Sequence, residues 1–359
     1  MSFKKYNAFG YRDKLALVLD RLDAAKTAIE NMPSGGDPIA YSIDENGVIS
    51  KGIVDFKLPG NAKDASDYAF SLFAQDIIGA ELRGNIKTTS LSPLENISGA
   101  YAFSSTFSDC KGLESADLST LKEVTGRYTM SDMFSNSSIE TVDVSSLEKV
   151  TGESAMSQCF SQCVNLESIS FDSLKEVGNK SMQRICSGCT ALKSVALPSL
   201  EKIGDYGISE MFRNCTALES MSFPNVETIS GYSFLYAFQG CSSLKTVSLP
   251  KVETALGYSF SYAFQDCTSL ESVEFTSLKN IDVSTAMNRT FSRCSSLKDV
   301  RFPVLGTEGS SVISSALRYL LSDVNGCTLH FAASAESRIR TMTGYPNFSG
   351  TNTVVLFDL

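Results

Sequence analysis

A repeat of about 26 residues dominates this sequence and limits what the chain can fold into. Six cysteines form its clearest column, each 26 or 27 residues after the one before: Cys163, Cys189, Cys215, Cys241, Cys267 and Cys294. Cys110 and Ser137 extend this cysteine column toward the N-terminus, which gives eight aligned units. Self-similarity at a fixed period of this length indicates a solenoid, in which each unit packs on its neighbours.

Apolar residues recur at fixed offsets before the cysteine column. Phenylalanine prevails three residues before it and large apolar residues stand seven before it, as Phe238 and Phe234 do before Cys241. The residue four before the column is mostly small or apolar, such as Ala237. Offsets of −7, −4, −3 and 0 match the apolar stripe of an amphipathic helix. The pattern therefore predicts one short helix in every unit.

The residues after the cysteine column alternate between apolar and polar, as around Val247 and Leu249, and a turn signal such as Pro250 follows. This alternation predicts a short strand. We therefore expect an α/β repeat solenoid, a right-handed superhelix with one strand and one short helix in each 26-residue coil. The strands would form a parallel sheet on one side and the helices would cover the other.

Two segments carry a family resemblance. Cys241-Ser-Ser-Leu-Lys-Thr-Val-Ser-Leu-Pro250, together with Ile203-Gly-Asp-Tyr-Gly-Ile208 and its closing Phe212-Arg-Asn-Cys215, resembles the BspA-like (Treponema-type) leucine-rich repeat. That repeat has the form C-x-x-L-x-x-I-x-L-P followed by I-G-x-x-A-F-x-x-C. The likeness spans about residues 53–305. The units here are about three residues longer than those of the family, and the extra residues lie before the cysteine column.

The resemblance implies a binding role. Members of this family look like surface adhesins and interaction proteins of host-associated microbes and protists, and similar repeats occur in phage and prophage proteins. The C-terminal stretch from Thr343 to Asp358 resembles the endings of some of those bacterial and prophage proteins.

The cysteines have a simple structural interpretation. Free cysteine behaves as a small buried hydrophobe, and Ser137 replaces it without breaking the repeat. Cys186 and Cys189 form a C-x-x-C, but zinc would need a second ligand pair, and the only histidine, His330, lies far away in the sequence. We expect no metal and no cofactor, with a disulfide or a metal as the alternative.

Composition argues against several classes of function. The net charge of −9 disfavours nucleic-acid binding, which depends on Lys and Arg contacts to phosphates. No apolar run approaches the roughly 18 residues of a membrane span, so membrane insertion is not expected. The first residues lack the apolar run of a signal peptide, which favours a virion-associated protein or a cell-surface protein exported without the Sec pathway. With one histidine and no isolated nucleophile or carboxylate motif, we expect no catalytic residues.

The repeat register divides the chain into four parts. We expect a helix and hinge at residues 1–38, a hairpin with a degenerate first repeat at 39–97, the repeats at 98–305 and a C-terminal cap at 306–359. The hairpin is predicted from strand-like segments that flank Asp44-Glu-Asn-Gly47. In the cap, Val354–Phe357 is predicted to be a strand and His330 to be structural.

The N-terminal helix is expected over about residues 11–32. Its apolar residues alternate four and three apart, as in a coiled-coil seam, and include Leu15, Val18, Leu22, Ala25 and Ile29. The seam favours self-association or docking into a partner, and packing against the solenoid itself is the alternative.

Two surfaces are candidate binding sites. The first, called the strand face, consists of the outward positions of the strands: Ser115, Asp117, Thr141, Asp143, Ser168, Ser170, Ser194, Ser220, Ser222, Thr246, Ser248, Ser272 and Glu274. Its alternative is a soluble sheet surface with no partner. The second is a tyrosine stripe: Tyr206, Tyr232, Tyr236, Tyr258 and Tyr262. These rings could recognise a ligand or could seal neighbouring units together.

The main hypothesis is a non-catalytic adhesion module for a protein or glycan on a host cell surface. The alternative is a phage virion component, such as a tail-tip, fibre or receptor-binding protein, docked through residues 11–32. The sequence does not name the ligand.

Overall fold

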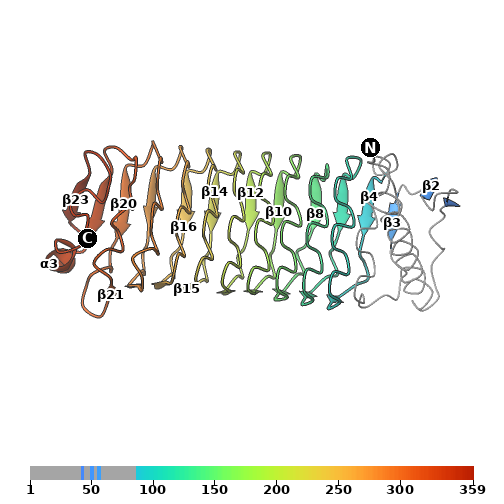
Figure 1. The fold of residues 1–359 in the computed structure, drawn as a ribbon, viewed down its shortest axis with the longest axis horizontal. Coiled ribbons are helices and arrows are strands. Elements are labelled where there is room, and N and C mark those ends of the chain that lie inside the picture. Colours follow the sequence, from blue (N-terminus) through green and yellow to red (C-terminus); the bar gives the residue numbers. More distant parts are fainter. Residues whose placement is uncertain (1–41, 44–48, 52–54, 58–85) are drawn as a thin grey trace, which may run out of the picture.

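The computed structural model describes residues 42–43, 49–51, 55–57 and 86–359, and these form a rod of stacked coils that runs from the first repeat to the C-terminus (Figure 1). The predicted helix at residues 11–32, with Leu15, Val18, Leu22, Ala25 and Ile29, lies outside the described residues. The N-terminal hairpin is partly described: β1 (Ser42–Ile43) pairs antiparallel with β2 (Ile49–Lys51).

One side of the rod is a ladder of parallel strands, one from each coil. Within a coil, the central residue of the strand points into the core and its neighbours point outward, as in the buried Met221 between the exposed Ser220 and Ser222. The strands in order are β3 (Asp55–Lys57), β4 (Thr88–Ser90), β6 (Ser115–Asp117), β8 (Thr141–Asp143), β10 (Ser168–Ser170), β12 (Ser194–Ala196), β14 (Ser220–Ser222), β16 (Thr246–Ser248), β18 (Ser272–Glu274), β20 (Asp299–Phe302), β22 (Thr328–Phe331) and β23 (Val354–Phe357).

The pairing in this ladder is interrupted twice. The paired groups are β3-β4-β6-β8, β10-β12 and β14-β16-β18-β20-β22-β23. Even so, β8 lies beside β10 and β12 lies beside β14, so the strand side is continuous along the rod. The predicted strand Val354–Phe357 is confirmed, because β23 pairs in parallel with β22 at the end of the ladder.

A second ladder of two-residue strands forms the next side of the coil, after the turn that follows each longer strand. It was not predicted. Its strands are β5 (Asn96–Ile97), β7 (Glu123–Val124), β9 (Lys149–Val150), β11 (Glu176–Val177), β13 (Lys202–Ile203), β15 (Thr228–Ile229), β17 (Thr254–Ala255), β19 (Asn280–Ile281) and β21 (Ser311–Val312).

The prediction of a helix in every coil is wrong. The segment before each cysteine is a chain of turns in which every fourth residue has a left-handed backbone, as at Tyr232, Tyr236 and Gly240 (φ 60°, 53° and 76°). Amide groups alternate between two partners: Phe234 N–H donates to Ser259 of the next coil (2.9 Å), whereas Leu235 N–H donates back to Tyr232 (3.1 Å). The described residues hold little helix, namely the 3₁₀ turn Ala333–Ala335 and α3 (Glu336–Ile339) in the C-terminal cap.

A period of four residues explains both the turns and the spacing of apolar residues that had suggested a helix. Two residues point inward and the next two point outward, so that Phe234 and Phe238 are buried while Tyr232 and Tyr236 are half-exposed. Over eight residues, this period places apolar side chains at nearly the offsets of a 3.6-residue helix. The segment is too short for the two periods to diverge.

Stacked phenylalanines form the centre of the core. Rings from successive coils lie nearly parallel, with centroids 5.7 Å apart for Phe107 and Phe134 and 5.3 Å apart for Phe238 and Phe264. All of these side chains are fully buried. The repeat therefore places identical residues above one another, which is how a single 26-residue unit, too small for a core of its own, becomes stable in the stack.

Candidate functional site

The cysteine column is buried, and its thiols have hydrogen-bond partners that the sequence did not predict. Each Sγ in the column from Cys163 onward donates to the main-chain carbonyl that lies three residues before the column in the preceding coil. Cys241 donates to Phe212 (3.0 Å) and Cys267 to Phe238 (3.1 Å). Burial raises the pKa of Cys241 from its ordinary value of 9.0 to about 12, so this thiol stays protonated at neutral pH.

All ten cysteines are free and buried. Cys186 and Cys189 are no exception, and the neighbouring Cys189 thiol, together with burial, raises the pKa of Cys186 well above its ordinary value. Among the described residues, no cluster of three or more His, Cys, Asp or Glu side chains could hold a metal ion. The column therefore acts in packing, and its thiols are second donors to main-chain carbonyls that already accept an N–H within their own turn, as Phe212 accepts from Cys215 (3.0 Å).

The strand face lies on the outward side of the longer ladder, where the predicted residues form two columns. They are half-exposed at Ser115, Asp117 and Ser170, and exposed at Thr141, Asp143, Ser168, Ser194, Ser220, Ser222, Thr246, Ser248, Ser272 and Glu274. Pairing keeps the columns in register, so that Ser220 lies beside Thr246 and Ser222 beside Ser248. The face thus presents small hydroxyls along most of its length.

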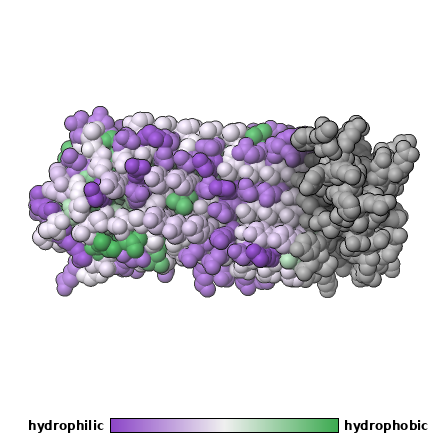
Figure 2. Space-filling model, in the orientation of Figure 1, coloured by the Kyte–Doolittle hydropathy of each residue, from purple (hydrophilic) through white to green (hydrophobic). Residues whose placement is uncertain are grey.

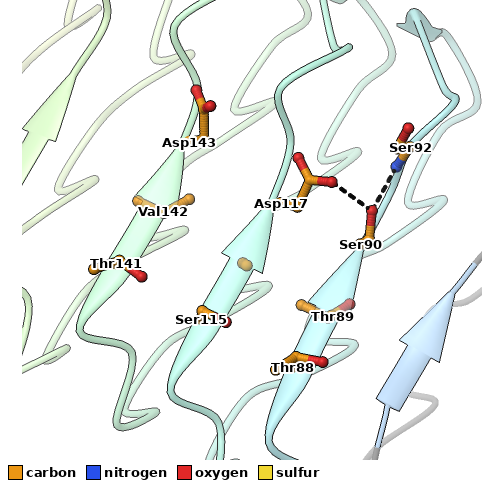
Figure 3. Close-up of a pocket in the computed structure, with 10 residues that line it drawn as sticks. Thr88, Thr89, Ser90, Ser92, Ser115, Asp117, Thr141, Val142 and Asp143 are labelled. Carbon is orange, nitrogen blue, oxygen red and sulfur yellow. Dashed lines mark hydrogen bonds between the residues drawn. The ribbon is translucent and has the colours of Figure 1, made fainter.

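A hollow of about 740 Å³ lies on the strand face over β4, β6 and β8 (Figure 3). Ser115, Asp117, Thr141 and Asp143, all predicted binding residues, line it together with Thr88 and its neighbours from the preceding strand. Its two carboxylates make it acidic.

Asp117 is fixed in position at the wall of this hollow. Its carboxylate accepts hydrogen bonds from Ser90 Oγ (2.8 Å) and from the main-chain N–H of Ser119 (3.0 Å). Hydrogen bonds from the Ser119 side chain above all, with those from the Ser119 main chain and Ser90, hold the pKa of Asp117 below its ordinary value despite partial burial. Asp117 is therefore ionised at neutral pH, and it disfavours an anionic ligand at this site.

The strand face changes character at its C-terminal end. The outer column continues from Glu274 to Arg301, His330 and Leu356. His330 lies between two carboxylates, with Nε2 3.0 Å from Asp299 and Nδ1 2.9 Å from Asp358. The histidine is 8% exposed and links three coils, which is consistent with the structural role predicted for it.

The tyrosine stripe consists of two parallel stacks. Tyr206 stacks on Tyr232 (ring centroids 4.4 Å apart), and Tyr232 stacks on Tyr258 (4.7 Å). Tyr236 stacks on Tyr262 (4.8 Å). The rings therefore join neighbouring coils, and they also remain accessible, since Tyr258 is 37% exposed and the others are half-buried.

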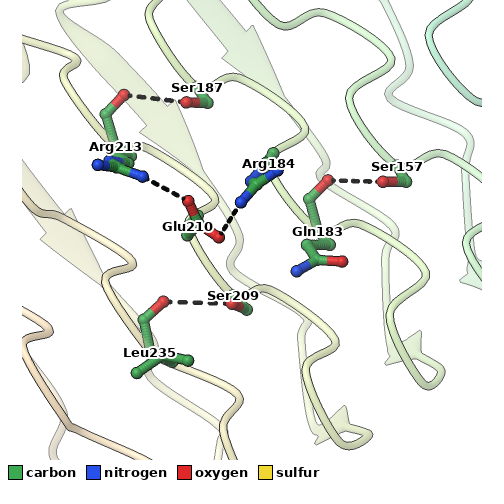
Figure 4. A network of polar contacts seen from close by, with 8 residues as sticks. All are labelled: Ser157, Gln183, Arg184, Ser187, Ser209, Glu210, Arg213 and Leu235. Carbon is green, nitrogen blue, oxygen red and sulfur yellow. Dashed lines mark hydrogen bonds and ion pairs between the residues drawn. The ribbon is translucent and has the colours of Figure 1, made fainter.

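Arginines accompany the second stack. Arg213 lies 5.9 Å from the Tyr236 ring centroid, and Arg289 lies 5.8 Å from that of Tyr262. The buried Glu210 carboxylate binds Arg213 (2.8 Å) and also Arg184 of the preceding coil (2.6 Å) (Figure 4). Around it, serine hydroxyls donate to carbonyls of the next coil, as Ser209 does to Leu235 (3.3 Å). This network ties coils together on the turn side of the rod.

A ladder of exposed Lys–Glu pairs follows the coil edges and was not predicted. Its members join successive coils, as in Lys193–Glu167 (3.0 Å), Lys245–Glu219 (3.2 Å) and Lys298–Glu271 (3.3 Å). Such exposed pairs contribute little stability individually. The sequence does carry a signal for these pairs. The charge at this position of the repeat alternates between negative and positive from one repeat to the next.

The surface in the view of Figure 2 is mostly hydrophilic with small hydrophobic areas. In the part of the chain that the structure describes, no helix is long and apolar enough to span a membrane. These features define a polar repeat scaffold, a class of protein whose long surfaces serve for binding.

The comparisons with known proteins agree with this class. The sequence matches the family described as BspA type leucine rich repeat region in six copies, over residues 49–159, 83–209, 153–236 and 209–316. The chain therefore belongs to the BspA-type leucine-rich-repeat family. A comparison with curated proteins finds no match.

Several solved structures match this chain at low identity. A leucine-rich repeat protein of T. pallidum is 21% identical, with a TM-score of 0.36, and the match covers 66% of this chain and 91% of that one. The pneumococcal vaccine antigen PcpA is 16% identical (TM-score 0.37; 88% and 93% covered). The internalin InlF of Listeria monocytogenes is 14% identical (TM-score 0.29; 93% and 82% covered).

Proposed function

We propose that this protein is a non-catalytic recognition module that binds a protein or glycan of a host cell surface through its strand face. The observation that carries the proposal is the hollow of about 740 Å³ over β4, β6 and β8, with its fixed, ionised Asp117. Proteins built from this repeat generally serve in adhesion or protein interaction. The chemistry of the face, hydroxyls with carboxylates at one end, suits a neutral or cationic ligand.

The rigidity of the face supports this role. Its side chains are short and stand on paired strands, so little conformational entropy is lost when a partner binds. From β4 to β18, the outward positions of the face include none of the exposed aromatic and arginine residues that dominate compact hot spots. Affinity would therefore come from many weak polar contacts along several coils, as suits an extended partner.

A steric block tests the proposal. Labelled full-length protein is assayed for binding to host epithelial cells and to a glycan array, beside a variant with Ser115→Arg, Thr141→Arg and Ser168→Arg. These positions are exposed or half-exposed, so the coils should fold, while the long side chains cover the hollow and the strand next to it. The matched control places arginine at three exposed turn residues, Thr190, Thr216 and Thr268.

We expect the strand-face variant to lose binding and the control to retain it. Equal binding by both variants would assign recognition to another surface. A wild-type chain that binds no cell, protein or glycan would overturn the proposal. The virion alternative depends on residues 11–32, outside the described residues, and stays a prediction.

A further inference from the structure

The tyrosine column, nine residues before each cysteine position, is interrupted in the middle of the rod. Tyr101 stacks on Tyr128 (5.1 Å), and three rings from Tyr206 to Tyr258 stack further along. The two positions between these stacks hold Ser154 and Lys180. Two successive coils thus lack the ring that the column otherwise provides.

The gap is a hollow of about 490 Å³ lined by six residues of three successive coils: Thr151, Glu153, Asn179, Lys180, Asp205 and Tyr206. Ser154 is small and buried, so it does not fill the space. The Lys180 ammonium lies 3.6 Å from Glu153 of the preceding coil, whereas Tyr206 belongs to the following coil.

Tyr206 is the aromatic wall of this hollow. One face of its ring stacks on Tyr232 of the following coil, at 4.4 Å and an angle of 6°. The opposite face is therefore the one directed toward the coil of Lys180 and the hollow. On the far side, Tyr128 does not offer an equivalent face, because Arg127 lies 5.0 Å from its ring centroid and reaches Glu153 (3.4 Å).

Polar groups surround this wall. Glu153 and Asp205 provide carboxylate acceptors at exposed positions, and Lys180 provides a cationic donor. Asn179 is held in place, since its Oδ1 accepts the main-chain N–H of Asp205 (2.9 Å), and its amide NH₂ remains as a further donor. The site thus combines one flat apolar surface with a rim of donors and acceptors.

We propose that this hollow binds a neutral hexopyranose residue of a glycan. A pyranose ring presents C–H groups on one face, which pack on an aromatic ring, and hydroxyls at its edge, which bond to carboxylates, amides and ammonium groups. The carboxylates of Glu153 and Asp205 are balanced by Lys180 and Arg127, so the rim has no net positive charge to favour an acidic sugar over a neutral one. An aromatic side chain of a protein partner would fit the wall but would leave the carboxylates desolvated without donors, which is costly.

The site is preformed, because the stack behind Tyr206 holds its ring in place before any ligand arrives. It lies apart from the strand face, where the two-residue strands lead into the turns. The inference therefore does not depend on the strand-face proposal, and the two can fail separately.

The test is a glycan array probed with the full chain. The array carries neutral mammalian oligosaccharides, their sialylated counterparts and neutral bacterial surface polysaccharides. Bound neutral glycans are then titrated by calorimetry and mapped by saturation-transfer NMR. We expect binding to neutral hexose-containing glycans, weaker binding to sialylated ones, and a preference between host and bacterial glycans that identifies the source of the ligand.

Three variants locate the site. Tyr206→Ala should weaken binding about ten-fold or more, equivalent to about 1.4 kcal/mol. Lys180→Tyr should abolish binding without unfolding the coil, because it extends the stack into the hollow and the backbone there has the φ of 58° found at Tyr206 (57°). Tyr258→Ala is the matched control, since that ring ends the same stack away from the hollow and is expected to leave binding unchanged.

Three outcomes would overturn the inference. The first is that the protein binds none of the neutral glycans on the array. The second is an equal loss of binding in the Tyr206 and Tyr258 variants, which would give the stack a purely structural role. The third is unimpaired binding by Lys180→Tyr. If the protein bound no glycan on the array and Tyr206→Ala removed its binding to a cell-surface protein, the hollow would accept a protein side chain instead of a sugar.

Discussion

His330 Nδ1 lies 2.9 Å from the carboxylate of Asp358, and this contact fastens the last strand of the rod to the coil before it. The other ring nitrogen reaches Asp299 on β20, so one side chain connects three consecutive strands of the ladder. A solenoid is exposed to fraying at its ends, because the last coil has a neighbour on one side alone.

Replacing His330 should loosen this end. We expect His330→Leu to destabilise β23 locally by about 1–3 kcal/mol, because two hydrogen bonds to carboxylates disappear. Hydrogen exchange measured by mass spectrometry should accelerate in residues 354–357 and stay unchanged in the central coils. Glu308→Ala, at an exposed carboxylate of the same region, is the control, and unchanged exchange in residues 354–357 would contradict the assignment.

The thiol hydrogen bonds of the cysteine column predict an order of substitutions. Cys241→Val removes one of the two donors to the Phe212 carbonyl, which keeps the main-chain N–H of Cys215, and should lower the free energy of unfolding by about 0.5–1.5 kcal/mol. Cys241→Ser keeps a donor, as Ser137 does at its own position, and should cost less. Urea denaturation of the three proteins gives the order, and a valine variant as stable as the wild type would show that the thiol acts by volume alone.

Alkaline pH should destabilise the rod through the same thiols. The pKa of Cys241 is raised by burial from 9.0 to about 12, so the unfolded chain loses this proton first as the pH rises. The stabilising contribution is complete below pH 9 and is lost between pH 9 and 12, by up to about 1.4 kcal/mol per pH unit for such a thiol. Urea midpoints between pH 7 and 11 should fall less steeply for Cys241→Ser than for the wild type, and parallel curves would refute this origin.

The left-handed turn positions predict a stabilising substitution. Gln162 is exposed and has a φ of 60°. Residues other than glycine, asparagine and aspartate are strained in this left-handed conformation. Gln162→Gly should therefore raise the free energy of unfolding by about 1 kcal/mol. Val164→Gly, at an exposed residue without a left-handed backbone, should lower it. A glycine at residue 162 that destabilises as much as one at residue 164 would argue against strain at the turn.

The strand half of each coil could be predicted from sequence because its alternation has one structural interpretation. The turn half could not, because its four-residue period imitates a helix over so short a segment. One signal would have distinguished them: the position directly before each cysteine of the column is mostly Asp, Asn or Gly, as at Asn214, Gly240 and Asp266. These residues tolerate a left-handed backbone and are poor choices inside a helix.

The candidate sites were predictable in part for a related reason. The outward strand positions follow from the period of two, which placed Asp117 and Asp143 beside one hollow. The gap beside Tyr206 depends on the positions of the Lys180 and Arg127 side chains. Each of these side chains pairs with Glu153 of a neighbouring coil. Contacts between coils have no signature within a single repeat.

Half of the amides in each turn segment donate to the next coil, and amides at the starts of the strands donate to the preceding coil, as Lys245 does to Glu219 (2.9 Å), so these bonds run along the axis of the rod. A protein anchored at one end and attached to a partner at the other would carry tension through them in series. Such a load would detach terminal coils one at a time. Each freed coil of 26 residues would extend to roughly 90 Å, so the rod would lengthen under force well before its remaining coils gave way.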